Sequence, residues 1–377
     1  MNFGFDADQK SLGETVARVL SGLPALSAPD LAPPPHAQVW DALAALGLFS
    51  LLVPERFDGV GMSLVDLALG VEALGAGLAP PVIVSTLVAT DVIVRHGSEA
   101  QQRELLPAIA AGTLKIAIAV LEAEQGYDPL DVRTTFAGAW LDGEKILVGD
   151  AHAADLFIVV VRRDDGTPAL VMVRKDTPGV VVRPHNDLDP TSGNCAVTFH
   201  RVAIDKGAVL GEAAPSRAVE RLFDAAATVH AGLLIGIAAK MLAASVEYAQ
   251  ARVQFDQPIG AFQAIKHRCA DMAVAVEAGR SVAYYAFWAV AEDAPDRARA
   301  ASMAKAYCGD VARQVGNETI QVHGGMGFTW ELGLHRYLRR AKLIEHSYGD
   351  AAWHNERILA TTLTALATAA EVQRDAA

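Results

Sequence analysis

The sequence predicts an α+β fold that is mainly helical. We expect an N-terminal helical domain over residues 1–113, a middle antiparallel β-sheet domain over 114–212 and a C-terminal four-helix bundle over 213–377. Three observations support this prediction. Apolar residues recur at helical spacing in the first third of the chain, short β-rich runs separated by turn residues fill the middle, and long alanine-rich stretches occupy the last third.

In the N-terminal domain, proline and small polar residues set the helix ends. Pro54 and Pro80-Pro81 stop a helix, since proline lacks the backbone N–H group that a helix interior needs. Ser63, with Asp66 three residues later, and Ser98 are side chains that cap helix N-termini. The expected helices cover Trp40–Leu52, Ser63 to Pro80, Val82–His96 and the stretch from Ser98 through Leu106.

The middle domain is predicted from short runs of β-branched and apolar residues. Asp142-Gly143 and Asp165-Gly166 suit the tight turns of an antiparallel sheet. The expected strands are Ile116–Leu121, Leu147–Val148, Leu156–Val161, Ala169–Val173, Val180–Val182 and Ala196–His200.

The C-terminal domain is predicted from four helical stretches with short connections, which favour an antiparallel bundle. They are Ala218–Arg252, Gln263–Glu292, Asp296–Val322 and Gly349–Thr368.

Composition excludes several classes of protein. The 377 residues carry a formal net charge of −12, whereas a nucleic-acid surface would need a basic excess. No apolar run reaches the ~18 to 20 uncharged residues of a membrane span, and no secretory signal opens the chain. Cys195, Cys269 and Cys308 are too widely spaced for a disulfide framework or a zinc site. We therefore expect a cytoplasmic protein without a metal site.

Two segments point to a nucleotide cofactor. Arg252 to His267 read R-V-Q-F-D-Q-P-I-G-A-F-Q-A-I-K-H. The guanidinium of Arg252, at a predicted helix end, suits two phosphate oxygens, and Gln254 can donate to phosphate or ribose. The apolar residues that could form a bed for an adenine ring are Phe255, Ile259, Phe262 and Ile265.

The second segment, Gln321 to Glu331, reads Q-V-H-G-G-M-G-F-T-W-E. Gly324 and Gly325 lack side chains and so allow a ligand to approach the backbone closely. Gln321 could then hydrogen-bond the edge of a nucleotide. Taken singly, each feature also has an ordinary structural explanation.

Together the two segments resemble the signatures of the acyl-CoA dehydrogenase family, whose members use FAD to remove two hydrogens from the α and β carbons of acyl-CoA thioesters. The order of helices, sheet and bundle is similar to that family's fold, so the resemblance covers nearly the whole chain. It implies that the cofactor-binding residues named above grip the ADP portion of an FAD bound in the neighbouring subunit.

The same resemblance shows that the usual catalytic base is missing. Most relatives place a glutamate before a glycine shortly after an A-K dipeptide, and Tyr348 stands at that position here. Another branch places it about 26 residues before the arginine, where this chain has Ala226, followed by Ala227 instead of an arginine. A phenol with a pKa near 10 is a poor substitute for a carboxylate.

The sheet domain departs from the family as well. Relatives carry T-E-P-x-x-G-S-D near the flavin, whereas Leu121 to Asp128 read L-E-A-E-Q-G-Y-D. Glu122, Gly126 and Asp128 survive, but Tyr127 replaces a small serine. Farther on, Leu147 and Gly149 stand where relatives have side chains that hydrogen-bond the flavin.

Other polar residues are candidates for roles in the site. Asp350 is the first alternative base, although an acid in the first turn also favours the helix dipole. Asp224, Glu345, His346 and His323 are expected to be structural, surface or interface residues. Arg336, Arg339 and Arg340 are expected to form a solvated or subunit-facing stripe.

The resemblance leaves three main functions open, and a fourth is that of flavin monooxygenase-like relatives with the same fold. In the first, the chain is the FAD-sharing partner subunit of a heteromeric enzyme, and the thioester lies in a second acyl-CoA dehydrogenase chain. Its last segment resembles those of small subunits acting on dicarboxylyl or steroid side-chain thioesters. In the second, it is a stand-alone acyl-CoA dehydrogenase with an atypical base. In the third, it is a non-catalytic scaffold. The first two make a homo-oligomer or an α2β2 hetero-oligomer the expected assembly.

Overall fold

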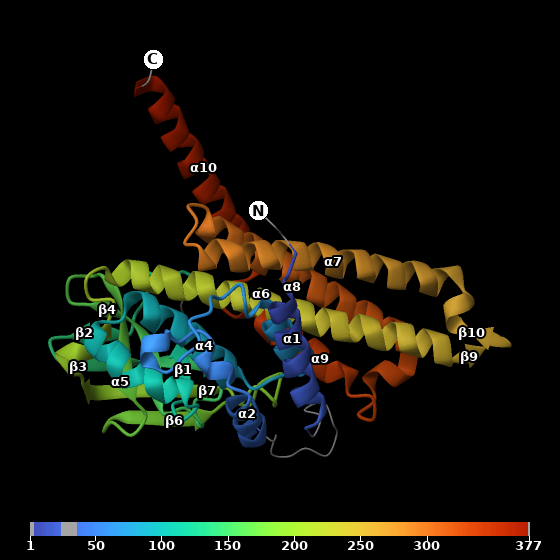
Figure 1. Ribbon diagram of the computed structural model, residues 1–377, viewed down its shortest axis with the longest axis horizontal. Coiled ribbons are helices and arrows are strands. Elements are labelled where there is room, and N and C mark those ends of the chain that lie inside the picture. The colour runs from blue at the N-terminus through green and yellow to red at the C-terminus, as the bar shows by residue number, and fades with distance from the viewer. Residues whose placement is uncertain (1–3, 24–35, 125, 376–377) are drawn as a thin grey trace.

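The computed structural model describes residues 4–23, 36–124 and 126–375. A helical N-terminal part packs beside a β-sheet, and long helices cross both (Figure 1). The N-terminal helices are α1 (Ala7–Ser21), α2 (His36–Ala45), α3 (Ala68–Ala76), α4 (Pro81–His96) and α5 (Glu99–Ala110).

Helix ends in this part follow capping chemistry. The Ser98 hydroxyl accepts a hydrogen bond from the Gln101 backbone N–H, and the Gln101 side chain accepts one from the Ser98 N–H, as a capping box requires. The expected helix over Trp40–Leu52 is wrong in its second half. It ends at Ala45 because Gly47 adopts a left-handed conformation (φ 84°), and a 3-10 turn, Leu48–Ser50, follows.

The sheet is mixed, so the expectation of a purely antiparallel sheet is corrected. Strands β1 and β2 run parallel to β4, while the other neighbouring strands are antiparallel. The order is β6-β7-β3-β2-β4-β5-β8, with β1 also paired to β4. The strands are β1 (Ile116–Ala119), β2 (Thr135–Ala137), β3 (Trp140–Val148), β4 (Leu156–Arg163), β5 (Pro168–Arg174), β6 (Val180–Pro184), β7 (Cys195–Ala203) and β8 (Val209–Leu210).

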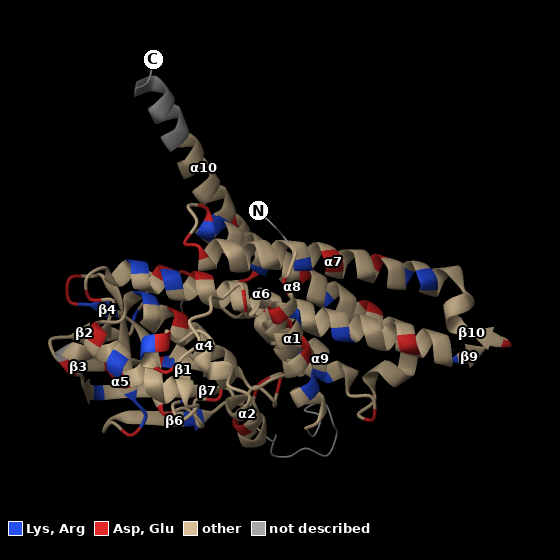
Figure 2. Cartoon of the chain, in the orientation of Figure 1, with Lys and Arg blue, Asp and Glu red and all other residues tan. Residues whose placement is uncertain are grey.

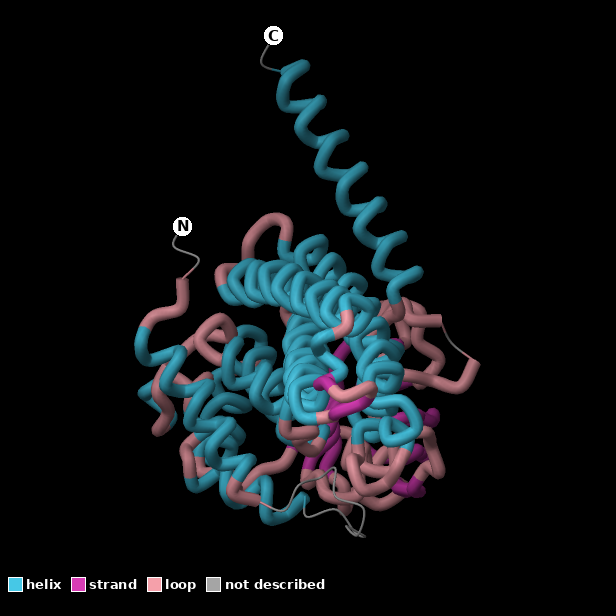
Figure 3. Tube along the Cα trace, turned by 90° about the vertical axis from the view of Figure 1, so that its right-hand side faces the viewer, coloured by secondary structure: helices cyan, strands magenta, loops and turns pink. Residues whose placement is uncertain are grey.

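The C-terminal part contains α6 (Pro215–Ala251), α7 (Gln263–Ala291), α8 (Arg297–His323), α9 (Leu334–His346) and α10 (Ala351–Asp375). The predicted stretch Gly349–Thr368 forms most of α10, which packs against α8 at its start and then leaves the body of the molecule (Figures 1 and 3). A further helix, α9, also packs into the bundle, against α8 and α6. Its sequence, L-H-R-Y-L-R-R-A-K-L-I-E-H, is highly charged but has apolar residues at helical spacing, so the signal for this helix was present in the sequence.

Helix α6 is the central element of the fold. Among the described helices it alone is long and apolar enough to cross a membrane, by length and composition only, and 61% of its most apolar stretch is buried inside the protein. It crosses α3 at close range. A Cβ atom at Gly236 would lie 1.9 Å from the Glu72 carbonyl oxygen, and one at Gly75 would lie 2.2 Å from that of Leu233. Glycine is required at both positions because the backbones touch.

Candidate functional site

The first signature segment forms an exposed hairpin at the end of α6. Its short strands are β9 (Val253–Gln254) and β10 (Gln257–Pro258), and the turn residues Phe255 and Asp256 have positive φ angles of 54° and 62°. This turn holds the Phe255 ring in solvent, 87% exposed, with Phe262 edge-on at 6.1 Å.

The other predicted cofactor residues of this segment lie beside the hairpin. Arg252 is exposed, and its guanidinium makes no hydrogen bond or ion pair with any described residue. The Gln254 side chain is also exposed and donates only to the carbonyl of Val253. Ile259 and Ile265 are half-buried. The hairpin therefore offers a cation, an amide and an aromatic ring to a ligand.

The second signature segment lies at the same end of the bundle. His323, the last residue of α8, stacks on Tyr248 of α6 at 4.3 Å, one turn before Arg252. Its Nδ1 also contacts the Thr319 carbonyl at 2.8 Å, so His323 has the packing role that the sequence predicted. Gln321 is exposed and has no polar side-chain partner among the described residues.

The two glycines after His323 are open to solvent. Gly324 has φ 58° and ψ −138°, a conformation that disfavours other residues. A Cβ atom at Gly325 would meet nothing within 4 Å, and Gly325 has no positive φ angle. Neither conformation nor packing in this chain requires glycine at Gly325. Close approach by a ligand from outside the chain would explain it, so this end of the bundle fits the ADP portion of a dinucleotide.

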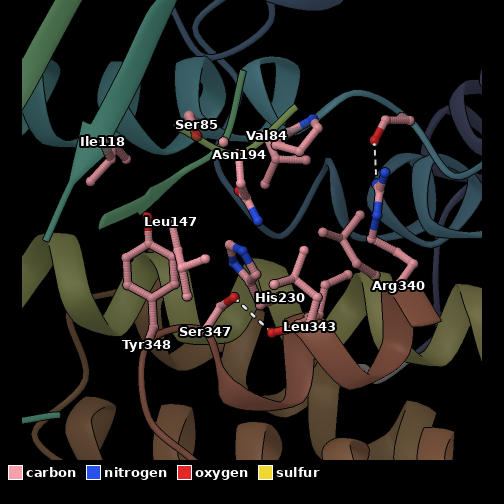
Figure 4. A pocket seen from close by; sticks show the side chains of 15 residues that line it. Val84, Ser85, Ile118, Leu147, Asn194, His230, Arg340, Leu343, Ser347 and Tyr348 are labelled. Carbon is pink, nitrogen blue, oxygen red and sulfur yellow. Dashed lines mark hydrogen bonds between the residues drawn. The ribbon is translucent and has the colours of Figure 1, made fainter. Parts of the chain in front are cut away.

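A pocket lies where α4, β1, β3, α6 and the α9–α10 loop meet (Figure 4). Its volume is about 70 Å³, far below the ~300 Å³ at which small-molecule sites begin. Leu147 and Tyr348 lie next to one another in its lining (Figure 4), and both have positive φ angles, 51° and 56°. Non-glycine residues in this conformation cost about 1–3 kcal/mol each and tend to occur at functional sites. The space is too small for a flavin ring or a long acyl chain.

Tyr348, which stands at one of the two expected base positions, lines this pocket. Ala226, at the other, is buried in α6 one turn before the lining residue His230. Burial raises the pKa of the Tyr348 phenol well above its ordinary value. The phenol is therefore fully protonated near neutral pH and cannot act as a base there.

His230 occupies the space between these positions, and the sequence analysis missed it. It lies one turn after Ala226 on the same face of α6, and its Nδ1 contacts the Ala226 carbonyl at 2.7 Å. Its ring centre is 4.8 Å from that of Tyr348. Burial, assisted by the positive charge of Lys305, lowers its pKa to about 4. His230 is thus neutral at pH 7, and the i, i+4 spacing from Ala226 was the available signal.

Lys305 of α8 holds the loop that carries Tyr348. Its buried Nζ donates to the carbonyls of Glu345 and Gly349, both at 2.9 Å. Burial lowers its pKa to about 7. Lys305 is therefore a positioning residue for the loop.

Asp350 lies just outside the pocket lining and caps α10. Its Oδ1 accepts a hydrogen bond from the Trp353 backbone N–H at 2.9 Å, and its backbone carbonyl accepts one from the His354 backbone N–H at 3.0 Å. Nothing in this geometry directs its carboxylate at the pocket.

Two acids behind the pocket are structural. Asp224 is fully buried and accepts from Arg297 at 2.8 Å and from Arg357 at 2.7 Å. Glu345, expected at the surface or an interface, is 8% exposed and pairs with Arg313 at 3.2 Å.

The expected basic stripe on α9 is partly wrong, because these arginines have partners within the protein. Arg340 is 4% exposed, pairs with Asp189 and donates to the carbonyls of Ala79 and Thr191. Although burial opposes ionisation of Asp189, the Arg340 guanidinium holds the pKa of that carboxyl below its ordinary value. Arg336 and Arg339 lie over the Trp330 ring.

Glu122, the surviving acid of the altered loop, stabilises that loop. It accepts from Lys145 Nζ at 2.7 Å, from the Thr134 hydroxyl at 2.6 Å and from the backbone N–H groups of Arg133 and Thr134. Burial lowers the pKa of Lys145 to about 8. Tyr127 points away from this cluster and contacts His346 at 3.3 Å.

The exposed end and the pocket are far apart. Arg252 follows His230 by 22 residues of the same helix, roughly 33 Å at a rise of ~1.5 Å per residue. The exposed end and the pocket are therefore two separate regions of the protein. No group of three or more His, Cys, Asp or Glu side chains in the described part of the chain is arranged to hold a metal ion.

Comparison with known proteins gives the family. Residues 7–113 match the acyl-CoA dehydrogenase N-terminal domain, and residues 216–363 match the C-terminal domain. The probable acyl-CoA dehydrogenase YngJ of Bacillus subtilis is 30% identical over 333 residues, which cover 83% of this chain and 86% of YngJ.

Solved structures have the same fold. Butyryl-CoA dehydrogenase from Megasphaera elsdenii superposes with a TM-score of 0.88 at 26% identity, covering 96% of this chain and 100% of that one. The ChsE4-ChsE5 complex from Mycobacterium tuberculosis gives 0.86 at 25% identity, covering 95% and 98%. FAD complexes occur among the solved relatives, and FAD is the cofactor of these enzymes. The chain belongs to the acyl-CoA dehydrogenase family.

Proposed function

We propose that this chain takes part in the α,β-dehydrogenation of an acyl-CoA thioester as an FAD-sharing partner subunit that lacks the usual catalytic glutamate. The observation that carries the proposal is the contrast between its two sites. The end that fits the ADP portion of FAD is open and unpartnered, whereas the pocket holds about 70 Å³ and a protonated phenol.

In this role the residues of the exposed end bind the cofactor and do no chemistry. Arg252 would hold the diphosphate through its guanidinium, and Gln254 and Gln321 would donate to the nucleotide. Phe255 and Phe262 would pack on the adenine, and Gly324 and Gly325 would let the backbone approach. When bound, FAD accepts the hydride that leaves the β carbon. A second acyl-CoA dehydrogenase chain would supply the base and enclose the thioester.

Relatives offer a precedent for such an assembly. The ChsE4-ChsE5 complex pairs two chains, and an FAD site shared between chains would make the oligomer obligatory for cofactor binding. We place the complex in the cytoplasm.

Co-expression with a second acyl-CoA dehydrogenase chain that carries the glutamate tests the proposal. We expect no FAD on the isolated chain and one FAD per pair in the purified complex. The Arg252→Ala complex should assemble but lose most of its flavin absorbance, whereas Lys240→Ala, an exposed cation elsewhere on α6, should retain it. Stoichiometric FAD on the isolated chain, bleached by acyl-CoA, would refute the partner role.

One observation favours a second candidate, a stand-alone dehydrogenase. His230 is neutral, lies between both vacated base positions, and has an Nε2 that bonds to no described residue. If the pocket opened, this nitrogen could accept the α proton. That candidate predicts that acyl-CoA bleaches the flavin of the isolated chain. The rate of bleaching should fall at least about a hundredfold in His230→Ala and should not change in Asp350→Ala. If the chain lacks flavin both when purified alone and when co-expressed with the second chain, it is instead a scaffold.

A further inference from the structure

A second cavity, of about 490 Å³, lies at the corner where α4 ends, α6 begins and α8 starts. Its lining contains four arginines, Arg95, Arg217, Arg221 and Arg297, together with His96. The opposing carboxylates are Glu220 and Asp293. Figure 2 shows blue bands of basic residues at this end of α6. Such a concentration of arginine is unexpected in a chain with a net charge of −12.

Two of the arginines form a rigid wall. Arg221 is 1% exposed and binds both carboxylate oxygens of Asp91, at 2.8 Å each. Arg297 is held by Asp224 at 2.8 Å and by Asp293. Because these guanidinium groups are already ordered, a ligand would lose little side-chain entropy by binding beside them.

The cavity also contains guanidinium hydrogen-bond donors that have no partner among the described residues. Arg217 is exposed in the first turn of α6 and makes no hydrogen bond or ion pair with any described residue. Nη1 of Arg95 and Nη2 of Arg297 are likewise without a partner in the described part of the chain, although other nitrogens of both groups are bonded. These groups come from three different helices, so a ligand in the cavity would contact all three.

The nearby carboxylates pair with the wall arginines and leave Arg217 without a partner among the described residues. Asp91 and Asp224 neutralise Arg221 and Arg297 from behind the wall, and Asp293 pairs with Arg297. Glu220 and Asp293 are the lining carboxylates that would oppose an anion. Burial and the charge of Arg221 lower the pKa of His96, so this side chain adds a hydrogen-bonding group without a charge at neutral pH.

We propose that this cavity binds a phosphate group, with Arg217 as its principal ligand and Arg95 and Arg297 as secondary donors. Guanidinium groups match phosphate oxygens in geometry and form strong charge-assisted hydrogen bonds with them. The phosphate could be free, or it could be the 3′-phosphate of CoA. The proposal goes beyond the shared FAD site, which lies at the other end of α6.

The test uses the purified chain without flavin or partner, so its result is independent of the proposed function. Binding of inorganic phosphate is measured by calorimetry against chloride at equal ionic strength. We expect Arg217→Ala to weaken phosphate binding by about tenfold or more, Arg217→Lys to weaken it less, and Glu220→Gln to tighten it. Arg103→Ala, which removes an exposed arginine whose one partner among the described residues is Glu99, is the matched control and should bind phosphate as the parent chain does.

The source of the phosphate follows from comparing CoA with 3′-dephospho-CoA. Binding that depends on the 3′-phosphate, and on Arg217, assigns the cavity to CoA. If both compounds bind equally well, while the binding of inorganic phosphate still depends on Arg217, the cavity is assigned to free phosphate. No measurable phosphate binding, or the same affinity in the parent chain and in Arg217→Ala, would overturn the proposal.

Discussion

The buried pair of Lys145 and Glu122 gives a quantitative test of how the altered loop is held. Lys145 is fully buried, and its Nζ donates to the Val120 carbonyl at 3.0 Å and to Glu122 at 2.7 Å. Replacing Lys145 by methionine keeps the apolar stem and removes both interactions. The Glu122 carboxylate, 8% exposed, would then lack its only cationic partner among the described residues.

The expected cost follows from what remains around Glu122. Breaking a buried ion pair by removing one partner costs about 3–5 kcal/mol. Glu122 would keep its hydrogen bonds from the Thr134 hydroxyl and from the backbone N–H groups of Arg133 and Thr134. We therefore expect the lower end of the range, about 3 kcal/mol. The double variant Lys145→Met/Glu122→Gln should cost less than the single one, because no charge stays buried without a partner.

Hydrogen exchange measured by mass spectrometry suits this test, since a chain with several domains need not unfold in one step. Peptides from β1 and β3 should lose about 3 kcal/mol of opening free energy in Lys145→Met, while peptides from α8 should not change. A loss below about 1 kcal/mol in those strands, or a double variant less stable than the single one, would refute the reasoning.

Three further predictions follow from the structure. Gly236→Ala places a Cβ atom 1.9 Å from the Glu72 carbonyl oxygen, so we expect the free energy of unfolding, measured by thermal denaturation, to fall by about 2 kcal/mol or more. The control Gly126→Ala adds a Cβ atom that meets nothing within 4 Å, so its free energy of unfolding should not change. Asp350→Ala removes the cap of α10 and should cost about 1 kcal/mol by the same measurement without changing cofactor content; lost flavin with unchanged stability would contradict the capping role. His230 has a pKa of about 4 against an ordinary 6.5, so its contribution to stability is full above pH 6.5 and is lost as the pH falls to about 4. The free energy of unfolding of His230→Gln should therefore fall less between pH 6.5 and pH 4 than that of the parent chain, by up to about 3 kcal/mol. The same pH dependence in both proteins would argue against a buried neutral imidazole.

The agreement between prediction and structure depends on how local each cause is. Ser98 caps α5 as expected because a capping box involves residues only three apart. The parallel pairing of β1 with β4 joins Ile116 to Leu156, forty residues later, and no local pattern encodes it. Strands β2 and β8 were missed because three and two residues are too few to show alternation.

The candidate site also contains both residues that contiguous sequence predicted and residues that only the fold brings together. The Arg252 and Gly324 segments were found because each is a continuous stretch of sequence, and they lie together at one end of the bundle. His230, Leu147 and Tyr348 meet only because α6, β3 and the α9–α10 loop converge in three dimensions. Likewise, Arg340 looked like a surface cation until its partner Asp189, in the loop between β6 and β7, was placed beside it.

By itself the sequence determined the family and the order of the three kinds of structure, because periodicity and contiguous motifs carry that information. It also predicts the cofactor-binding segments and the absence of the usual base. Only the tertiary structure decided the volume of the pocket, the neutral histidine inside it and the arginine-lined cavity. Burial and charge pairing between distant segments set all three, and those depend on how the helices and sheet pack.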